Sequence, residues 1–185
     1  GVVDIRLPIG ENIRKLAGAL GKPVDEIVVS VLNRPRHEQL IQEIRDAGAG
    51  TRLMSDGDVA GGINAARHAA RTDMCVGVGG SPEGIVTACA IKALGGHIQG
   101  RLWPRDDDER QRGIDAGLDM DKVYEANDLV RGDNTIFVAT GVTDGQLVAG
   151  VRREHGYIYT ESVVLRGASG TLRRIASEHL VSKWL

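Results

Sequence analysis

Short runs of β-branched and aliphatic residues alternate with helix-like patterns over most of residues 1–103. The run from Ile27 to Leu32 is dominated by aliphatic residues, which is typical of a strand buried on both faces of a sheet. Strands that alternate with helices predict an α/β fold with a largely parallel sheet. The expected strands are 27–32, 51–54, 74–78 and 97–103, and the expected helices are 11–20, 37–46, 59–71 and 81–94.

Two of the later helices carry clear signals at their N-termini. In the helix at 81–94, Ser81 is predicted as the N-cap and Pro82 as the first helical residue. A charged helix is expected at 105–117, and three aspartates, residues 106–108, lie at its start. We interpret these aspartates as a capping run and not as a metal site, because helix N-termini favour negative charge.

From Thr135 onward the pattern changes to strands joined by glycine turns. The expected turns are at Gly145, Gly156 and Gly170, and the expected strands are 136–139, 146–151, 157–165 and 171–175. This pattern predicts an antiparallel extension of the sheet. Neither a long polar linker nor an internal repeat interrupts the chain, so a single α/β domain is expected over residues 1–185.

The charge and hydropathy of the chain exclude two classes of partner. The formal net charge of −2 gives no general attraction to nucleic acid or to an anionic membrane. No apolar run approaches the ~20 residues that a membrane span requires. Any recognition of an anion must therefore be local.

The two cysteines and the start of the chain give expectations about the cellular compartment and about the length of the whole protein. Cys75 and Cys89 lie in apolar and small-residue runs, so we expect both to be free core residues. Free cysteines and a start without a signal-peptide pattern favour a reducing cytoplasm. The chain opens within a strand-like run, Gly-Val-Val-Asp, which predicts that it is a segment of something longer.

Two polar loops follow expected strands, where ligands bind in open α/β sheets. In the first, Arg34 and Arg36 flank Pro35 and could clamp a phosphate, although two solvated arginines explain the pattern equally well. In the second, Asp56 and Asp58 flank Gly57. These carboxylates could bind sugar hydroxyls or a divalent cation, or they could form a turn and an N-cap.

A third loop, residues 77–84, is rich in glycine and precedes the helix at 81–94. It resembles a dinucleotide-binding fingerprint only superficially, because the glycine spacing is wrong and Pro82 lies where the helix opens. Glu83 lies in the first helical turn. It is either a capping acid or a metal ligand on a rigid support.

Five segments together resemble the class II fructose-1,6-bisphosphatases, in order and over nearly the whole chain. They are VLNRPRHE at 31–38, MSDGDV at 54–59, GVGGSPEG at 77–84, FVATGVTDG at 137–145 and SGTLRRI at 169–175. The resemblance implies the fold of the lithium-sensitive phosphatase superfamily, layered α/β/α/β/α. This chain would be the C-terminal half of that fold.

The resemblance also implies roles for eight residues. Those that would bind the substrate are Arg34, Pro35 and Arg36 around a phosphate, Asp56, Gly57 and Asp58 at the sugar, and the backbone of Gly80. Glu83 would be a ligand for magnesium or manganese.

The departure from the family pattern is large. The family's other metal carboxylates lie in an Asp-Pro-x-Asp-Gly-Thr type motif and upstream of it, and no such motif occurs in these 185 residues. Thr140-Gly141 and Asp144-Gly145 do not replace it, because the paired acids are missing. We therefore expect that a catalytic N-terminal half is absent from this sequence, that no residue here is catalytic, and that the isolated chain is inactive.

The activity implied by the resemblance is the metal-dependent hydrolysis of fructose 1,6-bisphosphate to fructose 6-phosphate and phosphate in gluconeogenesis. This chain would hold the substrate and supply one metal ligand. The implied partners are the bisphosphate, the missing N-terminal half and further copies in a homo-oligomer, with neither nucleic acid nor membrane. Two alternatives stay open: hydrolysis of sedoheptulose 1,7-bisphosphate, and a sugar-phosphate-binding or subunit-assembly module without catalysis.

Overall fold

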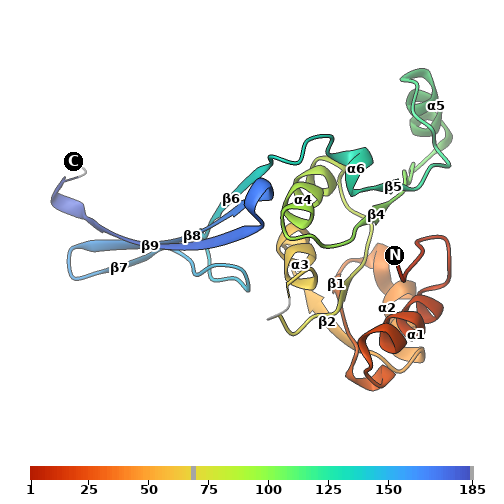
Figure 1. The fold of residues 1–185 in the computed structure, drawn as a ribbon, viewed down its shortest axis with the longest axis horizontal. Coiled ribbons are helices and arrows are strands. Elements are labelled where there is room, and N and C mark those ends of the chain that lie inside the picture. The colour runs from red at the N-terminus through yellow and green to blue at the C-terminus, as the bar shows by residue number, and fades with distance from the viewer. Residues whose placement is uncertain (68–69, 184–185) are drawn as a thin grey trace.

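The computed structural model describes residues 1–67 and 70–183 and has four layers (Figure 1). Helices α1 (Ile9–Leu20) and α2 (Glu38–Asp46) cover one face of a parallel sheet. Helices α3 (Asp58–Ala65) and α4 (Ser81–Ala93) lie between that sheet and an antiparallel one. The predicted α/β class, with parallel and antiparallel strands, is confirmed.

The parallel sheet forms as the alternation of strands and helices predicted. Strand β1 (Val28–Leu32) lies between β2 (Gly50–Met54) and β3 (Met74–Cys75), and all three run parallel. Val29 and Val31 are fully buried against α1 and α2. Strand β3 has two residues where five were expected, although the N–H of Val76 still donates to the carbonyl of Ser30 at 3.0 Å.

The two central helices approach closely through small residues. A Cβ on Gly62 of α3 would lie 2.6 Å from the methyl carbon of Thr87 in α4. Helix α3 ends at Ala65, so the predicted helix at 59–71 was too long; residues 68 and 69 of it lie outside the described residues. The N-cap of α4 is Gly80, not Ser81, because the extended backbone of Gly80 directly precedes the first helical residue.

The C-terminal strands form a separate antiparallel sheet and do not extend the parallel one, because α3 and α4 lie between the two. Its strands are β6 (Ile136–Thr140), β7 (Arg152–Glu154), β8 (Tyr157–Arg166) and β9 (Thr171–Leu180). The predicted strand at 146–151 was wrong. Those residues form a compact loop, because Leu147 turns into the core and a Cβ on Gly141 would overlap the carbonyl of Ala149.

An arm extends from the central layer (Figure 1). The predicted strand at 97–103 is reduced to β4 (Gln99–Gly100), which pairs with β5 (Tyr124–Glu125) outside both main sheets. Helices α5 (Asp107–Asp115) and α6 (Ala126–Leu129) belong to the same region. The side chain of Asp106 accepts from the N–H of Glu109 at 2.7 Å, which confirms the capping interpretation.

Four short 3₁₀ turns complete the elements: η1 (Val24–Glu26), η2 (Pro35–His37), η3 (Gly167–Ser169) and η4 (Val181–Lys183). Within the part of the chain that the structure describes, no helix is both long and apolar enough to cross a bilayer.

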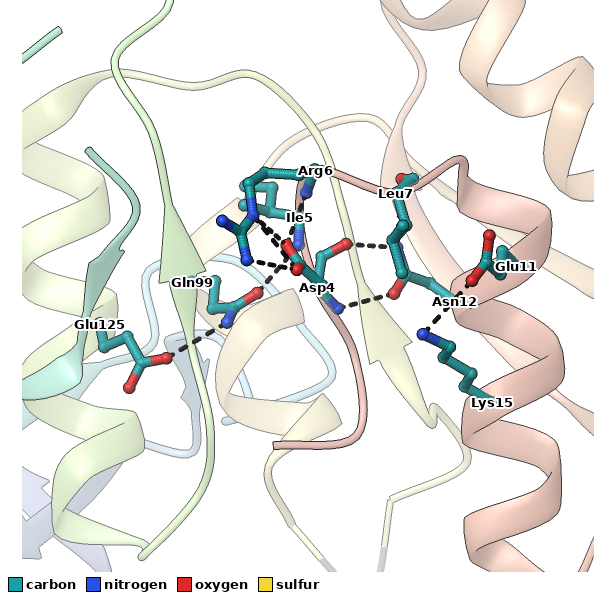
Figure 2. Close-up of polar contacts among 9 residues, drawn as sticks. All are labelled: Asp4, Ile5, Arg6, Leu7, Glu11, Asn12, Lys15, Gln99 and Glu125. Carbon is teal, nitrogen blue, oxygen red and sulfur yellow. Dashed lines mark hydrogen bonds and ion pairs between the residues drawn. The ribbon is translucent and has the colours of Figure 1, made fainter. Parts of the chain in front are cut away.

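Polar side chains join the N-terminal segment to α1 and β4 (Figure 2). Asp4 and the buried Asn12 exchange two hydrogen bonds of 2.8 Å, from the Asp4 N–H to Oδ1 and from Nδ2 to the Asp4 carbonyl. The N–H of Ile5 donates to Oε1 of Gln99 at 2.9 Å, and Gln99 donates in turn to Glu125. This network connects three segments that are far apart in the sequence.

Candidate functional site

Three loops lie side by side at the carboxyl ends of the parallel strands. Since β1 is flanked by β2 and β3, the loop at 33–37 lies between the loop at 55–58 and the loop at 77–80. The N–H of Asn33 donates to the carbonyl of Met54 at 2.8 Å, which holds the first two loops together where they begin. All eight residues named from the resemblance lie in these loops or in the helical turns that follow them.

Arg34 connects the first loop to the second. Its Nη2 donates to Oδ1 of Asp56 at 2.6 Å, and the Asp56 side chain is 84% exposed. Pro35 begins the 3₁₀ turn that follows, where its fixed φ is already suited to a helical turn. An arginine and an aspartate that were predicted to touch different parts of a ligand therefore pair with each other here.

Arg36 connects the first loop to the third. Its Nε donates to the carbonyl of Val78 at 2.9 Å. The terminal nitrogens of Arg36 have no hydrogen bond to any other described residue, so they remain available to an anion on this open surface. A guanidinium held through Nε presents its outer edge in a fixed direction, which suits two-pronged contact with a phosphate.

His37 makes a second link between the first and third loops, a role that the sequence did not predict. It is 1% exposed; its Nδ1 lies 2.8 Å from the carbonyl of Leu32, and its Nε2 lies 2.8 Å from the N–H of Val78. Since Nε2 accepts from a backbone N–H, Nδ1 carries the proton and donates to Leu32. Gly77 fits beneath this ring, and a Cβ there would lie 3.1 Å from it at a φ of 152°.

The presence of a histidine in a polar loop was the one sequence signal that could have indicated that His37 links two loops. Nothing in the pattern distinguishes a buried histidine from a solvated one, because its two partners are backbone groups. One of them, Val78, is 41 residues away.

The second loop directs a carboxylate toward the third. Gly57 adopts a left-handed conformation with φ 85° and is the N-cap of α3, so Asp58 is the first helical residue and not the cap. A Cβ on Gly79 would lie 2.8 Å from Oδ2 of Asp58. Glycine at position 79 therefore makes room for the carboxylate.

Gly80 and Glu83 form the N-terminal end of α4. A Cβ on Gly80 would overlap Oε2 of Glu83, so this carboxylate folds back over the start of the helix. Glu83 is exposed and its carboxylate pairs with no other described residue. An unpaired carboxylate oxygen is a donor that Mg²⁺ or Mn²⁺ accepts, and the helix N-terminus stabilises its charge.

The fit of a metal ion to this chain is partial. Among residues 1–67 and 70–183, no group of three or more His, Cys, Asp or Glu side chains is arranged to hold one. Glu83 thus supplies a single donor of the expected chemistry.

Cys75 lies behind the loops at the end of β3. Burial raises the pKa of its thiol, which keeps it protonated and a poor nucleophile. Cys75 and Cys89 are both free, as predicted. No nucleophilic role follows for either.

Comparison with known proteins gives consistent matches. The family described as "Bacterial fructose-1,6-bisphosphatase, glpX-encoded" matches residues 1–179. The chain is 40% identical to fructose-1,6-bisphosphatase class 2 of Haemophilus influenzae, over 97% of this chain and 58% of that protein. It is 39% identical to fructose-1,6-bisphosphatase 1 class 2 of Escherichia coli K12, over 99% of this chain and 58% of that protein. The chain therefore spans less than two thirds of the length of these curated relatives.

Proposed function

The chain belongs to the family of glpX-encoded bacterial fructose-1,6-bisphosphatases, and we propose that it forms the sugar-phosphate-binding part of such an enzyme. The reaction would be hydrolysis of fructose 1,6-bisphosphate to fructose 6-phosphate and phosphate, within gluconeogenesis. The observation that carries this proposal is the convergence of three loops, two arginines and three acidic side chains on one edge of the parallel sheet.

In this proposal the first loop holds the phosphate that does not react. Arg36 is already oriented through Val78, and Arg34 would exchange its contact with Asp56 for the phosphate. Asp56 would then be free to accept hydrogen bonds from sugar hydroxyls, with Asp58 beside it. Because the Asp56 side chain is 84% exposed, breaking this ion pair costs little.

In the same proposal, Gly80 and Glu83 lie at the end of the substrate that carries the reacting phosphate. The N–H groups at the start of α4 favour negative charge, so the backbone at Gly80 would contact the substrate. Glu83 would donate one oxygen to a magnesium or manganese ion. Such an ion activates water and neutralises charge on the phosphoryl group when it is bound.

We place the protein in the cytoplasm as a homo-oligomer, with residues 1–185 as one domain beside an N-terminal catalytic part. Sedoheptulose 1,7-bisphosphate stays an alternative substrate, because none of the three loops measures the length of the sugar.

A binding module without turnover is the second candidate. It is favoured by one observation: among the described residues, no group of three or more His, Cys, Asp or Glu side chains is arranged to hold a metal ion, so Glu83 belongs to no complete metal site there.

Titration of the chain with fructose 1,6-bisphosphate, followed by ¹H–¹⁵N NMR, tests the binding role. We expect saturable shifts in residues 33–37, 55–58 and 77–83, and their loss in the double variant R34A/R36A. The matched control R45A/R153A removes two exposed arginines from α2 and β7 and should bind normally. Shifts elsewhere, or none, would contradict the proposed site.

A further inference from the structure

A polar cavity lies at the C-terminal end of α3, whereas the three loops lie near its N-terminal end. Its volume is about 250 Å³, and it is lined by residues of β2, the C-terminal end of α3, Arg67, residues 70–72, the loop before β7, and β9. The residues that line it are Arg52, Asn64, Arg67, Ala70, Arg71, Thr72, Gln146 and Arg174. Asn64 follows Asp58 by six residues in α3, which is ~9 Å along the helix axis.

Four guanidinium groups surround this cavity, and only one of them has a carboxylate partner among the described residues. Arg174 donates to Oε1 of Glu161 at 2.7 Å. Arg52 donates to the neutral amide of Gln146 at 3.1 Å, and Arg67 donates to that of Asn64 at 3.3 Å. Arg71 is exposed and has no ion pair to a described residue. The cavity therefore carries an excess of positive charge in a protein whose net charge is −2.

The walls of the cavity are polar as well as charged. Asn64 and Thr72 are each 4% exposed, so amide and hydroxyl groups form its inner surface. A neighbouring cavity of about 240 Å³, lined by Val59, Phe137, Leu147 and other uncharged residues, shows the contrast. Like charges around one small space repel each other unless an anion lies between them.

From this arrangement we propose that the arginine cavity binds a small phosphorylated metabolite, at a site separate from the sugar-phosphate loops. Guanidinium forks bind phosphate oxygens in pairs, and Arg52, Arg67 and Arg71 are the three whose charge is not already neutralised. The volume is below the ~300–1,000 Å³ of pockets for drug-sized ligands, so the ligand is a phosphate on a small body.

The contacts of Gln146 should change when an anion binds in the arginine cavity. Its Oε1 accepts from both Arg52 and Asn64, at 3.1 and 3.4 Å. An anion that draws Arg52 away would weaken this contact. Gln146 also lines the neighbouring cavity, which reaches Gly57 of the second loop.

The test uses the chain with its first loop disabled, so that phosphate cannot bind there. The variant R34Q/R36Q is titrated with inorganic pyrophosphate and followed by ¹H–¹⁵N NMR. We expect saturable shifts at Arg52, Asn64 and the side-chain amide of Gln146. Adding R67Q/R71Q should weaken the binding about tenfold or more, because two charge-assisted contacts are lost.

The control adds R45Q/R153Q instead, which removes the same charge from exposed positions on α2 and β7. It should change the affinity by less than about twofold, since distant surface charges are largely screened at physiological salt. Well-dispersed spectra verify that each variant is folded. Equal weakening in the two quadruple variants, or unsaturated shifts spread over the surface, would overturn the proposal. This result is independent of whether the first loop binds a bisphosphate.

Discussion

At the scale of single residues, the loops contain polar side chains whose partners are on other loops. Arg34 pairs with Asp56 and Arg36 with the backbone of Val78. Residue type and position were enough to nominate both arginines, since two guanidiniums around a proline suit a phosphate. The pairing itself depends on which strands are neighbours. Their roles in binding can be tested by kinetics in the complete enzyme.

Replacing Arg34 or Arg36 by alanine should cost roughly 1.5–3 kcal/mol of binding to a sugar bisphosphate, or roughly ten- to a hundredfold in kcat/KM. The penalty should fall on bisphosphates and spare monophosphate substrates, because the contact that we propose is to a phosphate that does not react. Lysine should recover only part of it, since an ammonium lacks the two-pronged contact. Equal losses on a bisphosphate and its monophosphate analogue would refute this role.

Replacing Glu83 by glutamine should raise the metal concentration that gives half the maximal rate of the complete enzyme. Glutamine keeps the shape but loses the charge that a hard cation prefers. The measurement is a manganese titration of both proteins at saturating substrate. An unchanged titration would return Glu83 to a helix-capping role.

At the scale of elements, buried links hold loops and segments in place. His37 is the clearest case, because it joins the end of β1 to the loop after β3 through two hydrogen bonds of 2.8 Å. The segment before α1 is another, since Asp4 and Ile5 bond to α1 and β4. Each of these hydrogen-bonded links joins elements that are far apart along the chain.

Replacing His37 by alanine should lower the free energy of unfolding by about 2–4 kcal/mol, because it leaves buried backbone groups unsatisfied and a cavity behind. The NMR signals of residues 77–80 should broaden as that loop loses its support. Urea unfolding and backbone relaxation measure the two effects. Alanine at the exposed His155 is the control and should cost less than about 1 kcal/mol. Equal losses at both positions would show that His37 is no special link.

Acid should weaken the N-terminal segment through Asp4. The side chain of Arg6 holds the pKa of Asp4 at about 2, against 3.8 normally. A lowered pKa means that the folded state favours the charged form. The contribution of Asp4 to stability is therefore complete above pH 3.8 and is lost as the pH falls toward 2.

The variant R6Q should raise the pKa of Asp4 toward 3.8 but not fully, because the backbone N–H of residue 6 still donates to the Asp4 carboxylate; carbon-detected NMR titration of the carboxyl group measures this. D4N should flatten the acid part of the stability profile between these two pH values. A pKa near 3.8 in the unmodified chain would contradict the contact that Figure 2 shows.

At the scale of the whole molecule, the described residues build four layers, α/β/α/β, with α3 and α4 at the centre. The resemblance implied five layers, and the curated relatives are longer than this chain, which covers 58% of each. The edge of the parallel sheet that we propose to bind the substrate has no complete metal site among the described residues.

The 185-residue chain alone should therefore release no phosphate from fructose 1,6-bisphosphate in the presence of manganese. One carboxylate cannot hold the metal ions that the reaction needs. A phosphate assay compares the chain with buffer and with the complete enzyme. Release clearly above buffer, and abolished by E83Q, would refute the expectation.

Hydrophobic periodicity and turn residues predicted the local structure well where the apolar side chains of a segment are the ones that become buried. The strand predicted at 27–32 is observed at 28–32, and the helices predicted at 11–20 and 37–46 are observed as α1 and α2, because apolar spacing and burial agree there. The predictions failed where tertiary contacts outweigh local preference. Residues 146–151 were predicted as a strand but form a loop, because Leu147 is buried in the core cluster that α3, α4, β6 and β8 build.

The candidate site divides in the same way. The residue patterns nominated the arginines, the aspartates and Glu83 but left structural alternatives open, and the resemblance to the family supplied the proposed roles and added Gly80. Their pairing, the burial of His37 and the arginine cavity depend on which elements pack together. Such contacts join groups many residues apart. They form, and stabilise the fold, only when α3 and α4 are packed between the two sheets. The sequence therefore determined the chemical type of each candidate side chain, whereas the packing of the layers determined where it lies and which group it contacts.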